Sequence, residues 1–166
     1  MKNTAIVTGA SSGIGREISR VLLEMGYEVY GFGREFPEEE VYFHPIVCDL
    51  LNTPELERQI KEIRRRNDVS LLVNNAGVGY YGLHEELNVQ KIQKLVRTNL
   101  EVPMVLTNLL LRDLKKYSGT VINISSVTAQ LSNPHGCAYG ATKAGLSSFS
   151  RSLFDEVRKY GCLLYT

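Results

Sequence analysis

The sequence predicts an α/β fold, a doubly wound parallel sheet covered by helices on both faces in three α/β/α layers. Short apolar runs alternate with segments of helical period along the 166 residues, and a glycine-rich turn joins the first run to the first helix. The composition, 43% hydrophobic and 22% charged, is that of a globular chain. The length fits one domain, so we expect residues 1–166 to form a single domain.

The first expected elements are the strand Thr4–Thr8 and an amphipathic helix directly after the glycine turn. Gly26 stands where a left-handed residue would end this helix. The helix should bury one apolar stripe, made of Ile14, Ile18, Val21, Leu22 and Met25.

Two further strands are expected over Glu28–Phe32 and Tyr42–Cys48. Pro45 has no N–H to donate, so the second of these should lie at a sheet edge. Residues 34–43 are short for a parallel crossover and should form a compact loop with Glu38–Glu40 exposed.

The next helix begins with a strong start signal. Thr53 is the expected N-cap, Pro54 the first helical residue and Glu55 the acid of the first turn. Arg64–Arg66 should complement the negative end of the helix dipole. The apolar stripe consists of Leu56, Ile60 and Ile63.

The second half of the chain continues the alternation. Val89–Lys116 is helical by period, and Pro103 should kink or divide it. The other expected elements are the strands Ser70–Val73 and Thr120–Ile124, the helix Ala138–Tyr160 and the start of a sixth strand at Cys162–Tyr165.

Charge and composition exclude several classes of function. A net charge of +1 gives no reason to expect nucleic acid or an anionic membrane as a partner, and no apolar stretch is long enough to span a membrane. The three cysteines show neither paired spacing nor a metal-ligand pattern with the histidines. We therefore expect no metal, free thiols and a cytoplasmic protein.

The turn Thr8–Gly15 has the spacing Gly-x-x-x-Gly-x-Gly between a strand and a helix. Glycines allow unusual backbone angles and close approach to a pyrophosphate, which then meets free N–H groups at the positive end of the helix. The alternative is a tight turn without a ligand. The residues expected to hold a dinucleotide here are Gly9, Ser11, Ser12, Gly13, Ile14 and Gly15.

Arg34 follows the second expected strand, where the adenosine ribose of a bound dinucleotide would lie. An arginine there favours a 2′-phosphate, so we expect NADP(H) to be preferred, with NAD(H) possible. Glu35 and the absence of a basic residue at Ser12 speak against this preference. The alternative is an exposed arginine without a ligand.

Tyr139 and Lys143 stand four residues apart on one expected helix, so their side chains share a face. A neighbouring ammonium favours the phenolate and brings the tyrosine pKa toward the working range of an acid–base catalyst. Ser126, just past the fifth strand, could hydrogen-bond a substrate oxygen. By itself such a pair is common on surface helices.

Five motifs occur in one order along the chain: Thr8–Gly15, Asn74–Gly77, Thr98–Leu100, Asn123–Ser126 and Tyr139–Lys143. In these the sequence resembles the short-chain dehydrogenase/reductase family, in its Tyr-x-x-x-Lys branch, over essentially the whole chain. The resemblance implies a Rossmann-type dinucleotide-binding and catalytic domain. It further implies hydride transfer between C4 of a nicotinamide and a small-molecule carbonyl or secondary alcohol, without a metal.

The resemblance also implies roles for individual residues. Tyr139 would be the general acid–base and would also contact the cofactor, and Lys143 would lower its pKa and bind the nicotinamide ribose. Ser126, rather than Ser125, would hold the substrate oxygen, and Asn99 would anchor a proton-relaying water. The adenine would lie between Asp49 and Leu50, and the adenosine ribose beside Asn75, Ala76 and Gly77.

Five residues near this site stay ambiguous at the level of sequence. Pro134, His135 and Cys137 could line the substrate pocket, although a solvated histidine and a packed thiol are the simpler interpretation. Tyr80 and Tyr81 could wall the pocket or merely cover the end of the sheet.

Compared with the family, the sequence is expected to be C-terminally incomplete, because Gly161–Thr166 enters a sixth strand and stops. It would then lack the last strand and the substrate loop. Two functions stay open: an oxidoreductase, or a truncated dinucleotide-binding module without turnover. The full-length form is expected to be a homodimer or homotetramer that packs through the helices within Val89–Lys116 and Ala138–Tyr160.

Overall fold

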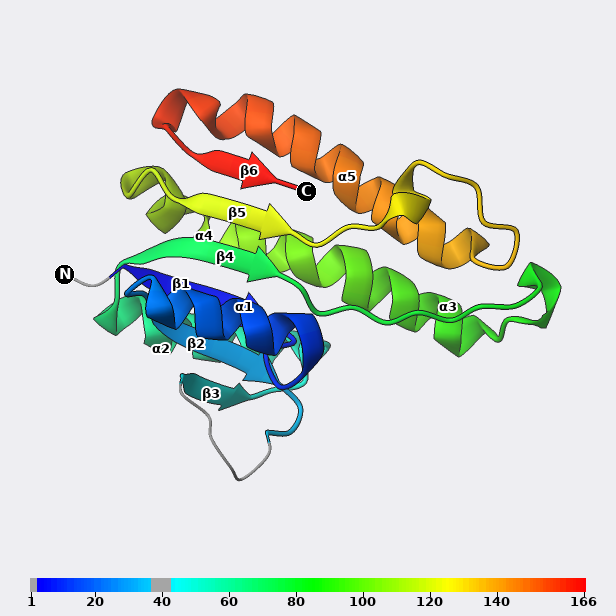
Figure 1. Ribbon diagram of the computed structural model, residues 1–166, viewed down its shortest axis with the longest axis horizontal. Helices are drawn as coiled ribbons and strands as arrows, with labels where there is room; N and C mark the ends of the chain where they lie inside the picture. Colours follow the sequence, from blue (N-terminus) through cyan, green and yellow to red (C-terminus); the bar gives the residue numbers. More distant parts are fainter. Residues whose placement is uncertain (1–2, 37–42) are drawn as a thin grey trace.

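The computed structural model describes residues 3–36 and 43–166, which build one six-stranded sheet (Figure 1). The strand order is β3-β2-β1-β4-β5-β6, and every neighbouring pair is parallel. The predicted doubly wound α/β/α fold is therefore confirmed. In this order the chain direction across the sheet reverses between β1 and β4, and a crevice is expected at their carboxyl ends.

The strands are β1 Thr4–Thr8, β2 Glu28–Gly33, β3 His44–Val47, β4 Val69–Asn74, β5 Thr120–Asn123 and β6 Leu163–Tyr165. The α-helices are α1 Gly13–Glu24, α2 Thr53–Arg66, α3 Val89–Val96, α4 Val102–Lys116 and α5 Cys137–Val157. A π-helical segment, η2, spans Arg97–Glu101, and short 3-10 turns form η1 His84–Glu86, η3 Val127–Ala129 and η4 Arg158–Tyr160. In the part of the chain described, no helix is both long and apolar enough to cross a membrane.

The two faces of the sheet are buried by different helices. Ile6 of β1 packs in one cluster with apolar residues of α2 and α4, whereas its neighbours Ala5 and Val7 pack in a second cluster with α1. Figure 1 shows α1 in front of the sheet and α4 behind it. Alternate side chains of a strand point to opposite faces, which is why a nearly continuous apolar run such as β1 is buried on both.

The edge position of β3 is confirmed, and its strand is shorter than the predicted Tyr42–Cys48. Tyr42 and the expected exposed segment Glu38–Glu40 lie outside the described residues. Phe36 and Phe43, on either side of the undescribed stretch, meet edge to face with ring centroids 5.9 Å apart. They belong to the apolar cluster on the α1 face of the sheet, so they help to cover that face beside β2.

The predicted apolar stripe of α1 is partly wrong. Leu22 is buried and Ile18 half-buried, but Ile14, Val21 and Met25 are exposed. Helical period alone could not show that α1 approaches the sheet through its small residues, Gly15 and Ser19, which are fully packed. The predicted end of the helix is confirmed, since Gly26 has φ +87° and Tyr27 N–H donates to Leu22 O at 3.0 Å.

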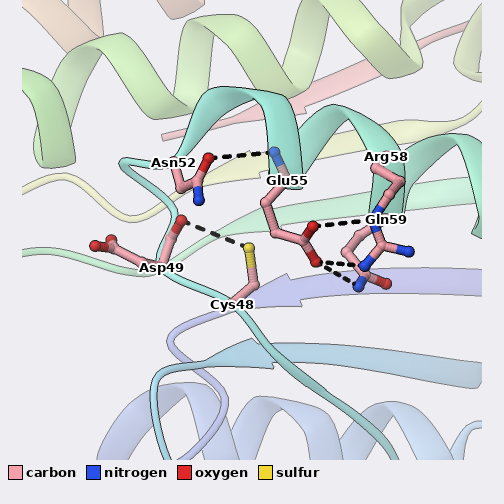
Figure 2. Close-up of polar contacts among 6 residues, drawn as sticks. All are labelled: Cys48, Asp49, Asn52, Glu55, Arg58 and Gln59. Carbon is pink, nitrogen blue, oxygen red and sulfur yellow. Dashed lines mark hydrogen bonds and ion pairs between the residues drawn. The ribbon is translucent and has the colours of Figure 1, made fainter.

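The start of α2 lies one residue earlier than predicted. Asn52, not Thr53, is the N-cap, and its Oδ1 accepts a hydrogen bond from Glu55 N–H at 3.3 Å (Figure 2). Pro54 then takes the second helical position, where its missing N–H again costs no intrahelical bond. The stripe Leu56, Ile60 and Ile63 is buried as predicted.

Pro103 divides the long helical segment as predicted, and the division takes a specific form. The five residues Arg97–Glu101 form a π-helix between α3 and α4, in which Val102 N–H bonds to Arg97 O. Pro103 has no N–H to give to the carbonyl of Asn99, four residues earlier. The widened turn therefore coincides with one of the predicted site residues, Asn99.

Candidate active site

The glycine turn adopts the backbone angles that its composition predicts. Gly9 and Gly13 have φ values of +67° and +51°, in the left-handed region. A Cβ on Gly9 would lie 2.9 Å from the side-chain nitrogen Nδ2 of Asn75, and a Cβ on Gly15 would collide with the backbone oxygen of Gly9. Glycine is thus needed at these positions for conformation and for close packing of the turn on the segment after β4.

Thr8 ties the ends of β1 and β4 together. Its Oγ1 accepts hydrogen bonds from the backbone N–H groups of Asn75 and Ala76, both at 3.0 Å, and donates to Val73 O at 3.4 Å. In return, Asn75 Nδ2 donates to Thr8 O at 3.0 Å. These contacts hold the two strands in register at the place where the chain direction reverses.

A cleft of about 1070 Å³ opens at this place. Of the predicted cofactor-binding residues, Gly15 does not line it, because it is buried under the turn, and neither do Tyr139 and Lys143. The exposure of Ile14 is explained by its place in the cleft wall. The predicted residues that line the cleft are Gly9, Ser11, Ser12, Gly13, Ile14, Arg34, Asp49, Leu50, Asn75, Ala76 and Gly77.

Sequence reasoning missed the opposite wall of the cleft, which is built by α3 and the start of η2. The lining residues there include Gln90, Gln93, Lys94, Arg97 and Thr98. Periodicity predicted a helix here but could not show what its outer face meets. Among the described lining residues, the three basic side chains Arg34, Lys94 and Arg97 outnumber the one acidic side chain, Asp49, a balance that favours an anionic ligand.

The segment after β3 is held in place beside the cleft. Asp49 Oδ1 accepts from Leu51 N–H at 3.0 Å, and Arg97 donates to Leu51 O at 2.9 Å. Figure 2 shows the Asp49 carboxylate pointing away from the Glu55–Arg58–Gln59 cluster of α2. Arg58 pairs with Glu55 and not with Asp49. The Asp49 carboxylate therefore stays available to a ligand in the cleft.

Lys143 is the most unusual charged group of the structure. It is only 4% exposed, and its Nζ donates to Ile124 O at 2.7 Å. Among the described residues no carboxylate forms an ion pair with it, and burial lowers the pKa of its ammonium. Gly77 lines the cleft, and a Cβ at this position would lie 3.7 Å from Lys143 Nζ. The ammonium therefore lies close to the cleft wall at Gly77.

The side chain of Asn99 makes three structural hydrogen bonds. Oδ1 accepts from Val78 N–H at 2.8 Å, while Nδ2 donates to Val78 O at 2.8 Å and to Thr142 Oγ1 at 3.2 Å. The side chain is 1% exposed. The side chain of Asn99 therefore clamps the segment after β4 onto α5.

Tyr139 lies half-buried near the start of α5, with Lys143 Nζ 5.9 Å from its ring centroid. Ser126 is the N-cap of η3, which packs against α5. Its neighbour Ser125 points toward α5 instead, where its hydroxyl lies 2.9 Å from Ser147 Oγ and donates to Lys143 O. The fold thus gathers Asn99, Tyr139 and Lys143 around the end of β4, with Ser126 on the turn beside α5.

The structure also places the ambiguous aromatic residues. The ring of Tyr81 is 59% exposed and lies 5.5 Å from that of Tyr139, whereas Tyr80 lies under Lys91. Gly82 N–H donates to the backbone carbonyl of His135 at 2.9 Å, which joins the loops after β4 and β5. Tyr81 therefore stands beside Tyr139 at the end of the sheet.

The loop before α5 behaves only partly as expected. His135 is exposed, as predicted for a solvated histidine. Cys137 is exposed as well, with its thiol 3.4 Å from Pro134 O, so the expectation of a packed thiol there is wrong. The helix begins at Cys137 itself, which places this side chain on an open first turn. Cys48 and Cys162 are buried free thiols, and burial raises the pKa of both.

No group of three or more potential metal-ligating His, Cys, Asp or Glu side chains occurs in residues 3–36 and 43–166.

Comparison with known proteins identifies the family. The model of the short chain dehydrogenases matches residues 3–164. The chain belongs to the short-chain dehydrogenase family.

Its relatives are named reductases and dehydrogenases. The chain is 32% identical to the NADPH-dependent 3-dehydrocapnine reductase of Ornithobacterium rhinotracheale, over 95% of its own length and 61% of that protein. It is 32% identical to the serine 3-dehydrogenase of Agrobacterium fabrum, over 97% of the chain and 68% of the relative. The chain thus spans 61% to 68% of the length of these two relatives.

Solved structures of the family share the fold. A short-chain dehydrogenase from Streptomyces avermitilis superposes with a TM-score of 0.90 at 32% identity, over 98% of this chain and 63% of that one. The aldohexose dehydrogenase of Thermoplasma acidophilum gives the same TM-score and coverage at 26% identity.

The buried lysine makes a prediction about pH. A lysine whose pKa is lowered by folding binds fewer protons in the folded than in the unfolded state. The free energy of unfolding then rises with pH between the folded pKa and the unfolded value of about 10.4. In urea titrations over this range, the free energy of unfolding of the wild type should rise relative to that of Lys143→Met.

The exposed lysine of α2, in Lys61→Met, provides the control for removing a positive charge. A wild-type minus Lys143→Met difference that stays constant or falls with rising pH would contradict the burial of an uncompensated ammonium.

Proposed function

We propose that this chain belongs to an NAD(P)-dependent oxidoreductase acting on a small carbonyl compound or secondary alcohol, with Tyr139 as general acid–base. The observation that carries the proposal is the cleft at the β1–β4 reversal. It runs from the glycine turn to Gly77, behind which the buried Lys143 approaches Tyr139. The names of the relatives point to the same class of reaction.

The glycine turn fits a pyrophosphate. Within the described residues, Ser12 precedes α1 without making a side-chain cap contact, so the first N–H groups of that helix are left for an anion. The positive φ values of Gly9 and Gly13 favour glycine, which puts no side chain into this space. We assign Ser11, Ser12, Gly13 and Ile14 to the phosphates, with Gly9 and Gly15 shaping the turn.

The other end of the cleft fits the adenosine. We assign Asp49 and Leu50 to the adenine, and Asn75, Ala76 and Gly77 to the adenosine ribose. When bound, the nicotinamide supplies or accepts the hydride, and Tyr139 and Lys143 would lie along its ribose. The basic balance of the cleft lining supports a ligand that carries phosphates.

The protein's own residues would handle the proton and the oxygen of the substrate. In reduction, the Tyr139 hydroxyl gives its proton to the carbonyl oxygen, while the Ser126 hydroxyl donates a hydrogen bond to the same oxygen. The Lys143 ammonium stabilises the phenolate that Tyr139 leaves behind. A water held by the carbonyl of Asn99 would return the proton by way of Lys143. Oxidation uses these steps in reverse.

The preference for NADP(H) rests on Arg34. This side chain is exposed at the end of β2 and lines the cleft, where a 2′-phosphate would lie. One relative is named as NADPH-dependent. NAD(H) stays the alternative, because Glu35 is the next residue.

A dinucleotide-binding module without turnover is the competing function. It would keep the cleft and the Tyr139–Lys143 pair but lack a closed substrate pocket. Binding of NADPH by a protein that reduces no carbonyl compound would favour it.

For the whole protein we propose a homodimer or homotetramer through α4 and α5, where Met104 and Phe154 are exposed. Its free thiols would suit the reducing cytoplasm.

Tyr139→Phe tests the catalytic role in the full-length protein. Removing the proton donor should lower carbonyl reduction by about a hundredfold or more, while the Kd for NADPH changes little. NADPH oxidation followed by absorbance gives the rate, and calorimetry gives the Kd. Tyr80→Phe, which removes the hydroxyl of the tyrosine under Lys91, is the matched control. Unchanged turnover in Tyr139→Phe would exclude the assigned role.

Arg34→Ala tests the cofactor preference. Loss of a charge-assisted contact to the 2′-phosphate should reduce the NADPH/NADH affinity ratio about tenfold or more. Arg20→Ala serves as the control, since Arg20 pairs with Glu17 and Glu24 on the exposed side of α1. If the ratio measured by calorimetry is the same in Arg34→Ala and in the wild type, the 2′-phosphate assignment is wrong.

A further inference from the structure

Ser126 makes two hydrogen bonds to a single residue. It is the N-cap of η3, and its Oγ accepts from Thr128 N–H at 3.2 Å and from Thr128 Oγ1 at 2.9 Å. The first contact is an ordinary cap that any residue at position 128 could provide through its backbone. The second requires a hydroxyl at that position.

These two contacts fix the direction in which Ser126 can donate. A serine hydroxyl has two acceptor lone pairs and one proton. Thr128 fills both acceptor sites, and because Thr128 Oγ1 is itself the donor of its bond, the Ser126 proton cannot point back to it. The proton must point away from Thr128.

We propose that Thr128 is a positioning residue that makes Ser126 a dedicated hydrogen-bond donor to the substrate oxygen. The inference rests on the proposed function, in which that oxygen is protonated by Tyr139. A hydroxyl that accepts hydrogen bonds becomes a better donor, because chains of such bonds polarise one another. Thr128 would therefore both orient Ser126 and strengthen its bond to the developing oxyanion.

η3 holds Ser126 and Thr128 next to α5, the helix that carries Tyr139. Gly140 directly follows Tyr139, and a Cβ at this position would lie 3.2 Å from Thr128 O. Figure 1 shows η3 against the first turns of α5. Glycine at position 140 lets the turn approach, and Ala129 N–H closes the turn on Ser126 O at 3.0 Å.

The neighbouring serine shows what the arrangement avoids. Ser125 has its hydroxyl engaged with Ser147 Oγ and Lys143 O, both on α5. Its proton is therefore used inside the protein. Thr128 gives Ser126 only donors, so the proton of Ser126 stays available for a ligand.

The test compares Thr128→Val with Thr128→Ser in the full-length protein. Valine keeps the shape and the backbone N–H but removes the hydroxyl donor, whereas serine keeps the donor. We expect Thr128→Val to lower kcat for a panel of aldehydes and ketones about five- to tenfold, the range for loss of one hydrogen bond. Its Kd for NADPH and its Tm should stay close to those of the wild type. Thr128→Ser should retain at least half of kcat.

Crystal structures of the three proteins give a readout independent of turnover. Ser126 Oγ should hold one position in the wild type and in Thr128→Ser, and should leave it or occupy two in Thr128→Val. Equal kcat in Thr128→Val and wild type, or equal losses in both variants, would overturn the inference.

The failure of the proposed function would look different. A wild type that binds NADPH but reduces nothing in the panel would contradict the oxidoreductase, and the position of Ser126 then decides the inference alone. An unmoved Ser126 Oγ in Thr128→Val would overturn it in either case.

Discussion

The buried ammonium of Lys143 is the group on which the arrangement of this site depends. A charge removed from water is costly unless it is both paired and hydrogen-bonded, and among the described residues this ammonium has a hydrogen bond to the backbone carbonyl Ile124 O, at 2.7 Å, but no ion pair. This hydrogen bond fixes the position of α5 along the end of β5. Gly77 leaves the other side of the ammonium close to the cleft, where a ligand with hydroxyl or phosphate oxygens could complete its contacts. In our account the protein tolerates this charge because its ligand and Tyr139 use it.

Neutral hydrogen bonds, rather than further charges, hold the elements around this lysine. Thr8 joins the ends of β1 and β4, and Asn99 joins the segment after β4 to α5. Asn123, at the end of β5, accepts from Asn74 of β4 and donates to Ser150 of α5, both at 2.8 Å. These contacts join β1 to β4, β4 to β5 and β5 to α5, so the ends of the three strands are held in a fixed relation to the helix that carries Tyr139. A site positioned in this way adds no second buried charge to the cost of Lys143.

Sequence reasoning anticipated the parts that depend on local chemistry. The strand–glycine–helix start, the left-handed Gly26 and the break near Pro103 follow from backbone preferences of single residues, and the structure has all three. It failed where tertiary packing decides. Periodicity counted Ile14 as core, although it lines the cleft, and could not see that α3 forms the opposite wall. The sequence places a hydroxyl two residues after Ser126, at Thr128. That this hydroxyl donates to Ser126 Oγ became clear only from the geometry of η3.

The most direct test of this account is calorimetric titration of the 166-residue chain with NADPH, with a thermal melt at the same cofactor concentrations. Our proposal that the glycine turn binds the cofactor's phosphates predicts saturable heat and a Tm that rises with cofactor concentration, because the ligand binds only the folded state. The absence of both heat and a thermal shift at millimolar NADPH would contradict it.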